Sequence, residues 1–127
     1  MEQYLIDTNI VSDYLSCAIS DTGLKYMDNI IDSVPNISII SKIELLSWRC
    51  SHATELKVLD FVNECNVLNI SDEVVRYCVV LRKSKKIKTP DAIIAATALS
   101  KGYAIITHNK KDFSGIKGLR FIDPHDL

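Results

Sequence analysis

The sequence predicts a single α/β domain with a mainly parallel central sheet flanked by helices, and three observations lead to this prediction. Short apolar runs that end in polar turns alternate with longer segments of helical periodicity, a pattern typical of parallel sheets. The length of 127 residues suits one domain with a sizeable core, so we assign residues 1–127 to it. The segment 88–102 has the pattern of an apolar helix that is buried on nearly every side.

The expected strands are short and apolar. Tyr4–Ile6 comes first, and the polar residues 7–9 behind it form a turn that caps the next helix. Pro35 and Asn36 open the second strand. In chain order, we expect strands at residues 4–6, 37–40, 67–70, 103–107 and 120–122.

The expected helices lie between these strands and carry apolar residues at helical spacing. In the second helix, Leu24, Met27, Ile30 and Ile31 recur with the helical period. In chain order, we expect helices at about residues 10–16, 22–33, 42–50, 53–65, 74–83 and 90–101. A basic loop over residues 83–88 joins the last two.

The last of these helices has its start and its end marked in the sequence. Thr89 suits the N-cap, Pro90 suits the first helical position, and Gly102 suits the residue just past the end. Asp91 lies in the first turn of this otherwise apolar helix. The helix dipole favours a carboxylate there, so Asp91 is a suitable oxygen ligand for a hard cation.

Three further acids are expected at the same edge of the sheet as Asp91. Asp7 ends the first strand, Glu44 lies in the first turn after the second, and Asp112 follows the fourth by a few residues. Ligands of parallel α/β sheets bind outside the carboxyl ends of the strands. Four carboxylates at one edge repel one another, and we therefore expect a cation between them.

Each acid also has a purely structural explanation, and these alternatives stay open. Asp7 could be part of a turn and cap, Glu44 could complete a capping box with Ser41, Asp91 could interact only with the helix dipole, and Asp112 could be an exposed loop acid beside Lys110 and Lys111. It is the set of four, in this order, that favours a metal site.

Composition narrows the class of protein further. No apolar run approaches the roughly 20 residues of a membrane helix, and the N-terminus lacks a basic signal region, so we expect a cytoplasmic protein. The four cysteines have no close metal-ligand spacing, and the spacing of the three histidines, at positions 52, 108 and 125, predicts no ligand or general-base role. The net charge is −1, but Lys85, Lys86 and Lys88 precede Asp91 and would suit a phosphate backbone.

The whole chain resembles the PIN-domain ribonucleases, in particular the VapC-type toxins of toxin–antitoxin pairs. Four segments carry the resemblance: residues 4–10, 39–45, 89–98 and 105–113. It implies endonucleolytic cleavage of RNA with one or two Mg²⁺ or Mn²⁺ ions, a homodimer, and a cognate antitoxin protein.

The resemblance also implies roles for individual residues. The acidic site maps onto Asp7, Glu44, Asp91 and Asp112, with Thr8, Thr107 and Asn109 as supporting polar residues. Asn109 stands where many family members have an acid, which leaves one negative charge fewer.

The residue types suggest how the work is divided within this site. We expect Asp7 and Asp91 to bind metal directly, and Glu44 and Asp112 to bind through water or to orient the nucleophile. The main alternative is a non-catalytic PIN-like module that binds RNA or protein. An aspartyl-phosphate phosphatase would need an acid at Asn9, and a receiver domain would need paired acids near the start of its sheet.

Overall fold

The computed structural model describes residues 2–127 and contains a five-stranded sheet in which every pairing is parallel, in the order β3-β2-β1-β4-β5. In chain order the elements are β1 (Tyr4–Ile6), α1 (Thr8–Leu15), α2 (Asp21–Asp32), β2 (Asn36–Ser38), α3 (Ile39–Leu46), α4 (His52–Glu64), β3 (Asn66–Leu68), α5 (Asp72–Ser84), α6 (Thr89–Lys101), β4 (Ala104–Ile106), α7 (Lys110–Phe113), β5 (Phe121–Ile122) and a 3₁₀ turn, η1 (Pro124–Asp126). The predicted α/β domain with a parallel sheet is confirmed.

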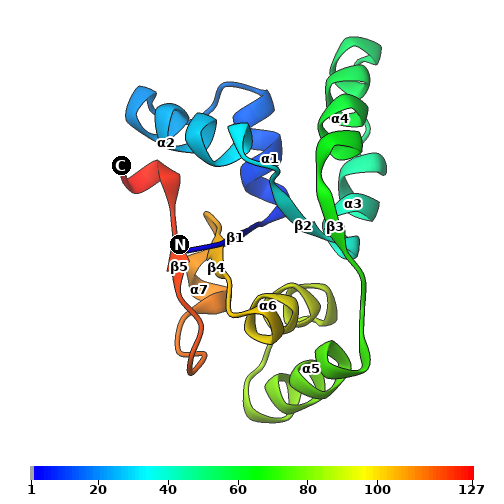
Figure 1. Ribbon diagram of the computed structural model, residues 1–127, viewed down its shortest axis with the longest axis vertical. Helices are drawn as coiled ribbons and strands as arrows, with labels where there is room; N and C mark the ends of the chain where they lie inside the picture. The colour runs from blue at the N-terminus through cyan, green and yellow to red at the C-terminus, as the bar shows by residue number, and fades with distance from the viewer. Residues whose placement is uncertain (1) are drawn as a thin grey trace.

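Helices cover both faces of this sheet, with α1 to α4 on one side and α5 and α6 on the other (Figure 1). Side chains of a strand alternate between the two faces, so neighbouring residues enter different cores. Leu5 and Ile105 pack with α5 and α6, whereas Ile6 and Ile106 pack with α1 to α4. Strands β1 and β4 are thus covered on both faces, which explains why they are apolar throughout.

Helix α6 is buried on most sides, as its composition predicts. Six of its residues are buried, among them Ile94, Ala95 and Ala96. It ends at Gly102, whose φ of 70° is in the left-handed region that glycine adopts without strain. At the start the prediction is wrong by one residue, because Lys88 is the N-cap, Thr89 is already helical, and the cap has no side-chain hydrogen bond.

The region around the second strand differs more from the prediction. The strand ends at Ser38 and the helix begins at Ile39, so Ser38, and not Ser41, is the N-cap. Ser38 Oγ accepts a hydrogen bond from the Ser41 backbone N–H over 3.1 Å. Glu44 therefore lies in the second turn of α3, and the predicted capping box with Ser41 is wrong.

Two short elements near the C-terminus were not predicted. Helix α7 carries Asp112, which the sequence analysis placed in a loop. The turn η1 packs against α2, and a Cβ on Gly23 would lie 2.4 Å from the carbonyl oxygen of Pro124. The C-terminus lies beside α2 as a result (Figure 1). Within residues 2–127, no helix has the length and apolarity needed to cross a membrane.

Candidate acidic metal site

The site is built around Asp7, which follows β1 and caps α1. Its Oδ1 accepts a hydrogen bond from the Thr8 backbone N–H over 2.8 Å, and its Oδ2 accepts one from the Thr107 hydroxyl over 2.8 Å. The side chain is buried, and burial raises the pKa of Asp7 above its usual value, while the two hydrogen bonds act in the opposite direction. Asp7 is thus a capping residue and a buried carboxylate at once.

Glu44 is joined to this centre through Thr8. The Thr8 hydroxyl donates to Glu44 Oε1 over 2.7 Å and lies 2.9 Å from the hydroxyl of Ser41, which is fully buried. Thr8 and Ser41 therefore fix one oxygen of an otherwise exposed glutamate. Sequence reasoning missed Ser41 because the assumed capping box gave its side chain another role.

Asp91 lies in the first turn of α6 and is half-buried. Its pKa is raised to about 6, first by burial and then by repulsion from Asp7 and Asp112. A smaller contribution comes from Glu44. The electrostatic coupling shows that the four carboxylates lie close enough to affect one another, although they come from four separate segments of the chain.

The polar stretch after β4 holds the remaining side chains in place. The Thr107 hydroxyl, besides donating to Asp7, accepts the backbone N–H of Asn109 over 2.9 Å. Asn109 Nδ2 donates to Asp112 Oδ2 over 2.6 Å. Asn109 thus replaces an expected acid with a neutral donor, which orients Asp112 and partly offsets its negative charge.

The topology explains why these residues meet. The chain runs from β1 outward to β2 and β3, then crosses through α5 and α6 to β4 on the other side of β1. The strand order therefore reverses between β1 and β4, and ligands of open α/β sheets bind at such a switch point. Asp7 and Thr107 stand at the carboxyl ends of these two strands.

The four acids carry negative charge that has no basic partner. Within residues 2–127, none of Asp7, Glu44, Asp91 and Asp112 forms an ion pair with a lysine, arginine or histidine. Among residues 2–127, no three of these acids offer ligand oxygens that all lie within 4.8 Å of one another. This donor set fits Mg²⁺ or Mn²⁺, because such an ion accepts a few carboxylate oxygens and keeps several waters.

A basic depression lies on one side of the acids. It is lined by Arg82, Lys86, Ile87, Lys88 and Asp112. Of the three lysines predicted to contact RNA, Lys86 and Lys88 thus border an acid of the site. Lys85 instead donates from Nζ to the Ser114 carbonyl over 2.9 Å. Arg82, which was not among the predicted RNA contacts, lies in the last turn of α5 and joins the group.

A second depression lies against α3. Thr8, Ser12, Glu44, Leu45 and Trp48 line it. Trp48 is half-buried and packs on the core under α1 to α4, and its ring also borders the space beside Glu44. Glu44 thus borders a depression with an aromatic residue, and Asp112 borders a basic one.

Comparison with known proteins gives a family match and several similar structures. The family model described as the PIN domain matches residues 4–119. A toxin–antitoxin complex from Klebsiella pneumoniae is 32% identical, with a TM-score of 0.76 over 98% of this chain and 100% of that one. None of the curated proteins matches this chain.

Two more distant structures share the fold. DNA-bound VapBC from Salmonella typhimurium is 22% identical, with a TM-score of 0.77 over 98% of this chain and 99% of that one. FitAcB from Neisseria gonorrhoeae is 18% identical, with a TM-score of 0.79 over 98% of this chain and 100% of that one.

Proposed function

The chain belongs to the PIN-domain family, and from that premise we propose that it is a Mg²⁺- or Mn²⁺-dependent endoribonuclease that acts as the toxin of a toxin–antitoxin pair. The observation that carries the proposal is the set of four carboxylates at the β1/β4 switch point without a basic partner. The raised pKa of Asp91, about 6, is in keeping with this proposal, because shifts caused by burial and neighbouring carboxylates cluster at functional sites.

The proposed mechanism divides the work between the acids. Asp7 and Asp91 would hold one or two ions directly, and Glu44 and Asp112 would hold them through water or would orient the attacking water. When bound, Mg²⁺ or Mn²⁺ supplies positive charge to the scissile phosphate and lowers the pKa of a bound water.

The supporting residues keep these carboxylates in place and guide the substrate. Thr107 and Thr8 fix the oxygens of Asp7 and Glu44, and Asn109 fixes Asp112. Lys86 and Lys88 attract the RNA backbone next to Asp112.

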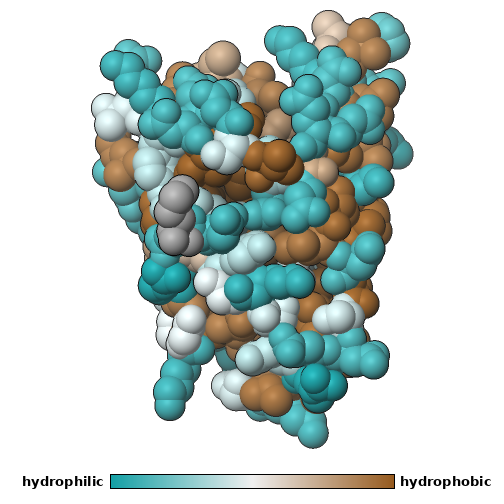
Figure 2. Space-filling model, in the orientation of Figure 1, coloured by the Kyte–Doolittle hydropathy of each residue, from teal (hydrophilic) through white to brown (hydrophobic). Residues whose placement is uncertain are grey.

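The proposed partners are a cognate antitoxin and a second copy of the chain. Apolar side chains reach the surface beside α3 and α4 (Figure 2), and α5 carries a further group. The exposed residues are Ile43, Leu46, Leu56 and Leu59 on α3 and α4, and Val75, Tyr77, Val79 and Val80 on α5. Exposed apolar groups of this extent are typical of protein–protein contacts. The similar structure from Klebsiella pneumoniae is itself a toxin–antitoxin complex.

The test is cleavage of a labelled structured RNA by the purified protein in Mn²⁺, in Mg²⁺ and in EDTA. We expect cleavage in either metal, none in EDTA, and none with the Asp91→Asn variant. The matched control is Asp72→Asn, which changes an exposed first-turn acid of α5 away from the site. Cleavage that survives in EDTA or in Asp91→Asn would contradict the proposal.

The non-catalytic alternative has its own signature. A binding module would bind the RNA without cleaving it and would not bind Mn²⁺ in calorimetry. RNA binding that is unaffected by Asp91→Asn, together with absent Mn²⁺ binding, would favour that alternative.

A further inference from the structure

A second group of metal-ligand residues lies at the same sheet edge, outside the acidic site. His108 follows β4, Asp123 follows β5, and His125 lies in η1. Each offers one ligand atom, and these atoms lie within 4.8 Å of one another; among residues 2–127 this is the only such group. The spacing of the histidines along the sequence predicts no ligand role. The three residues meet only in the fold, where the parallel pairing of β4 with β5 brings them together.

The geometry between His108 and Asp123 is close to that of two ligands on one ion. His108 Nδ1 lies 2.9 Å from Asp123 Oδ2. Two ligands of a tetrahedral zinc ion stand about 3.3 Å apart, given metal–ligand bonds of about 2.0–2.1 Å. A small opening of this pair therefore makes room for an ion.

Asp123 is held rigidly and has little access to water. Its side chain is 1% exposed, and its Oδ1 accepts the backbone N–H of His125 over 2.9 Å. The nearest lysine, Lys110, has its Nζ 2.7 Å from Asp126 but 3.8 Å from Asp123, so its charge is directed mainly at Asp126. Lys110 and Asp123 still form an ion pair at the outer limit of ion-pair distance, but the lysine is half-exposed and shared with Asp126, so a metal ion would compensate the buried charge of Asp123 more fully.

His125 is oriented by a carboxylate from another helix. Its Nε2 lies 2.8 Å from Oδ2 of Asp13 in α1, and its ring centroid lies 4.2 Å from that of His108. Histidines that bind metals commonly have their second nitrogen bonded to a carboxylate in this way. Asp13 thus prepares the ring for a ligand role.

The turn that carries Asp123 and His125 is packed tightly against α2. Gly23 leaves no room for a side chain beneath the carbonyl of Pro124. The hydroxyl of Ser20 donates to the carbonyl oxygen of Leu127 over 3.0 Å. The two ligands in this turn are therefore positioned before any ion binds.

We propose that His108, Asp123 and His125 form a binding site for a divalent transition-metal ion of the zinc type. Imidazole nitrogens favour such ions, whereas the oxygen ligands of the acidic site favour Mg²⁺ or Mn²⁺. The ion fastens the C-terminal turn to β4. This inference is independent of the proposed nuclease activity.

The test is Zn²⁺ binding by the full chain, stripped with EDTA and dialysed, in a large excess of Mg²⁺ that occupies the acidic site. We expect one Zn²⁺ per chain at the new site and a higher melting temperature with Zn²⁺. His125→Gln and His108→Gln are each expected to weaken binding by about 100-fold or more, since even changes outside the ligand shell cost about 10–100-fold.

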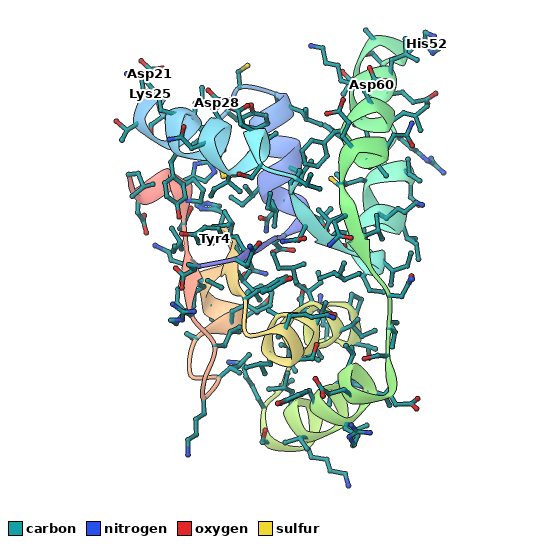
Figure 3. The ribbon with its side chains drawn as sticks, in the orientation of Figure 1. Tyr4, Asp21, Lys25, Asp28, His52 and Asp60 are labelled. Atoms are coloured by element: carbon teal, nitrogen blue, oxygen red, sulfur yellow. The ribbon has the colours of Figure 1, made fainter. Side chains whose placement is uncertain are left out.

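The matched control is His52→Gln, which changes a histidine at the outer end of α4, far from η1 (Figure 3). This variant is expected to bind Zn²⁺ like the wild type. Co²⁺ absorption spectra separate the site from the free cysteines, because nitrogen and oxygen ligands give no thiolate-to-cobalt bands. If His125→Gln fails to fold, His108→Gln decides, because that ring is 56% exposed. Zinc binding unchanged in the folded variants, thiolate bands in the Co²⁺ spectrum, or no Zn²⁺ binding would each overturn the site.

Discussion

The replacement Asp91→Asn is expected to stabilise the metal-free protein while it abolishes the proposed activity. The pKa of Asp91 is raised to about 6 from 3.8, so the ionised side chain is less stable in the folded protein than in the unfolded chain. Asparagine keeps the shape of the side chain and removes the charge that Asp7 and Asp112 oppose. Most substitutions destabilise a protein, which makes a gain in stability diagnostic here.

The size of this gain follows from the pKa. A difference from 3.8 to about 6 corresponds to about 3 kcal/mol at neutral pH. Asp91 is only half-buried, and screening by water reduces this to about 1–2 kcal/mol. The lost interaction with the dipole of α6 subtracts about 0.3–1 kcal/mol. The net gain is about 1 kcal/mol, which raises the melting temperature by roughly 3–6 °C for a chain of this length.

The gain depends on pH with a definite sign. Above pH 6 the carboxyl of Asp91 is ionised in both states, and the cost to the folded protein is complete. As the pH falls from 6 toward 4, the folded protein binds a proton that the unfolded chain does not, so the wild type gains stability. The advantage of Asp91→Asn is therefore largest above pH 6 and shrinks as the pH falls toward 4.

Urea denaturation in EDTA at pH 7.5 and at pH 5 measures this effect, with Asp72→Asn as the control. Asp72 is an exposed first-turn acid of α5, so its replacement removes only an interaction with the helix dipole. We therefore expect the free energy of unfolding of Asp72→Asn to be lower than that of the wild type by up to about 1 kcal/mol. Added Mn²⁺ should stabilise the wild type more than Asp91→Asn. If Asp91→Asn is less stable than the wild type at pH 7.5 in EDTA, the electrostatic reasoning is refuted.

Three further substitutions test other parts of the site and the fold. Glu44→Gln keeps an acceptor for Thr8 on an exposed side chain, so we expect stability within about 0.5 kcal/mol of the wild type and a loss of RNA cleavage of about 100-fold; unchanged cleavage would leave Glu44 a structural role only. Thr107→Val removes the hydroxyl that donates to buried Asp7, which should lower the free energy of unfolding by about 1–3 kcal/mol in urea denaturation. It should also raise the pKa of Asp7, so that metal binding requires a higher pH. An unchanged pH dependence of metal binding would argue against this link. Gly23→Ala places a Cβ 2.4 Å from a backbone oxygen of η1 and should cost about 1–3 kcal/mol; a neutral effect would show that this turn can move.

Much of the fold was predictable because its signals are local. The apolar strands β1 and β4 and the helix α6 between Pro90 and Gly102 were found with ends within one or two residues. These elements are buried on nearly all sides and must therefore be apolar, which makes them easy to recognise in the sequence. With the helices between them, they lead directly to a parallel sheet.

The boundary between β2 and α3 was not predictable, because two serines compete for the cap. Ser38 and Ser41 are equally good N-cap residues, and local sequence does not rank them. The pairing of β2 with β3 ends at Ser38, which lets the helix begin at Ile39. At the other end, β2 begins at Asn36, one residue before the predicted start. The Asn36 side chain is used inside the sheet, where its Nδ2 donates to the Tyr4 carbonyl and its Oδ1 accepts from Asn66.

The candidate site likewise has a part that the sequence predicts and a part that it does not. The four acids follow from strand ends and a helix start, so the sequence was enough to place them at one edge. Contacts between distant segments are different. The link from Thr8 to Ser41 and the group of His108, Asp123 and His125 depend on the packing of side chains from separate elements, which no spacing in the sequence records.

The acidic site also explains a feature of the core around it. Ionised carboxylates without basic partners destabilise the folded chain, and helix α6, which carries Asp91, offsets this with more buried residues than any other described helix. An alternative with a lysine placed among the acids would be more stable but would fill the place of a cation. A protein whose stability rises when an ion or a basic side chain neutralises this edge therefore couples its folding to whatever occupies the site.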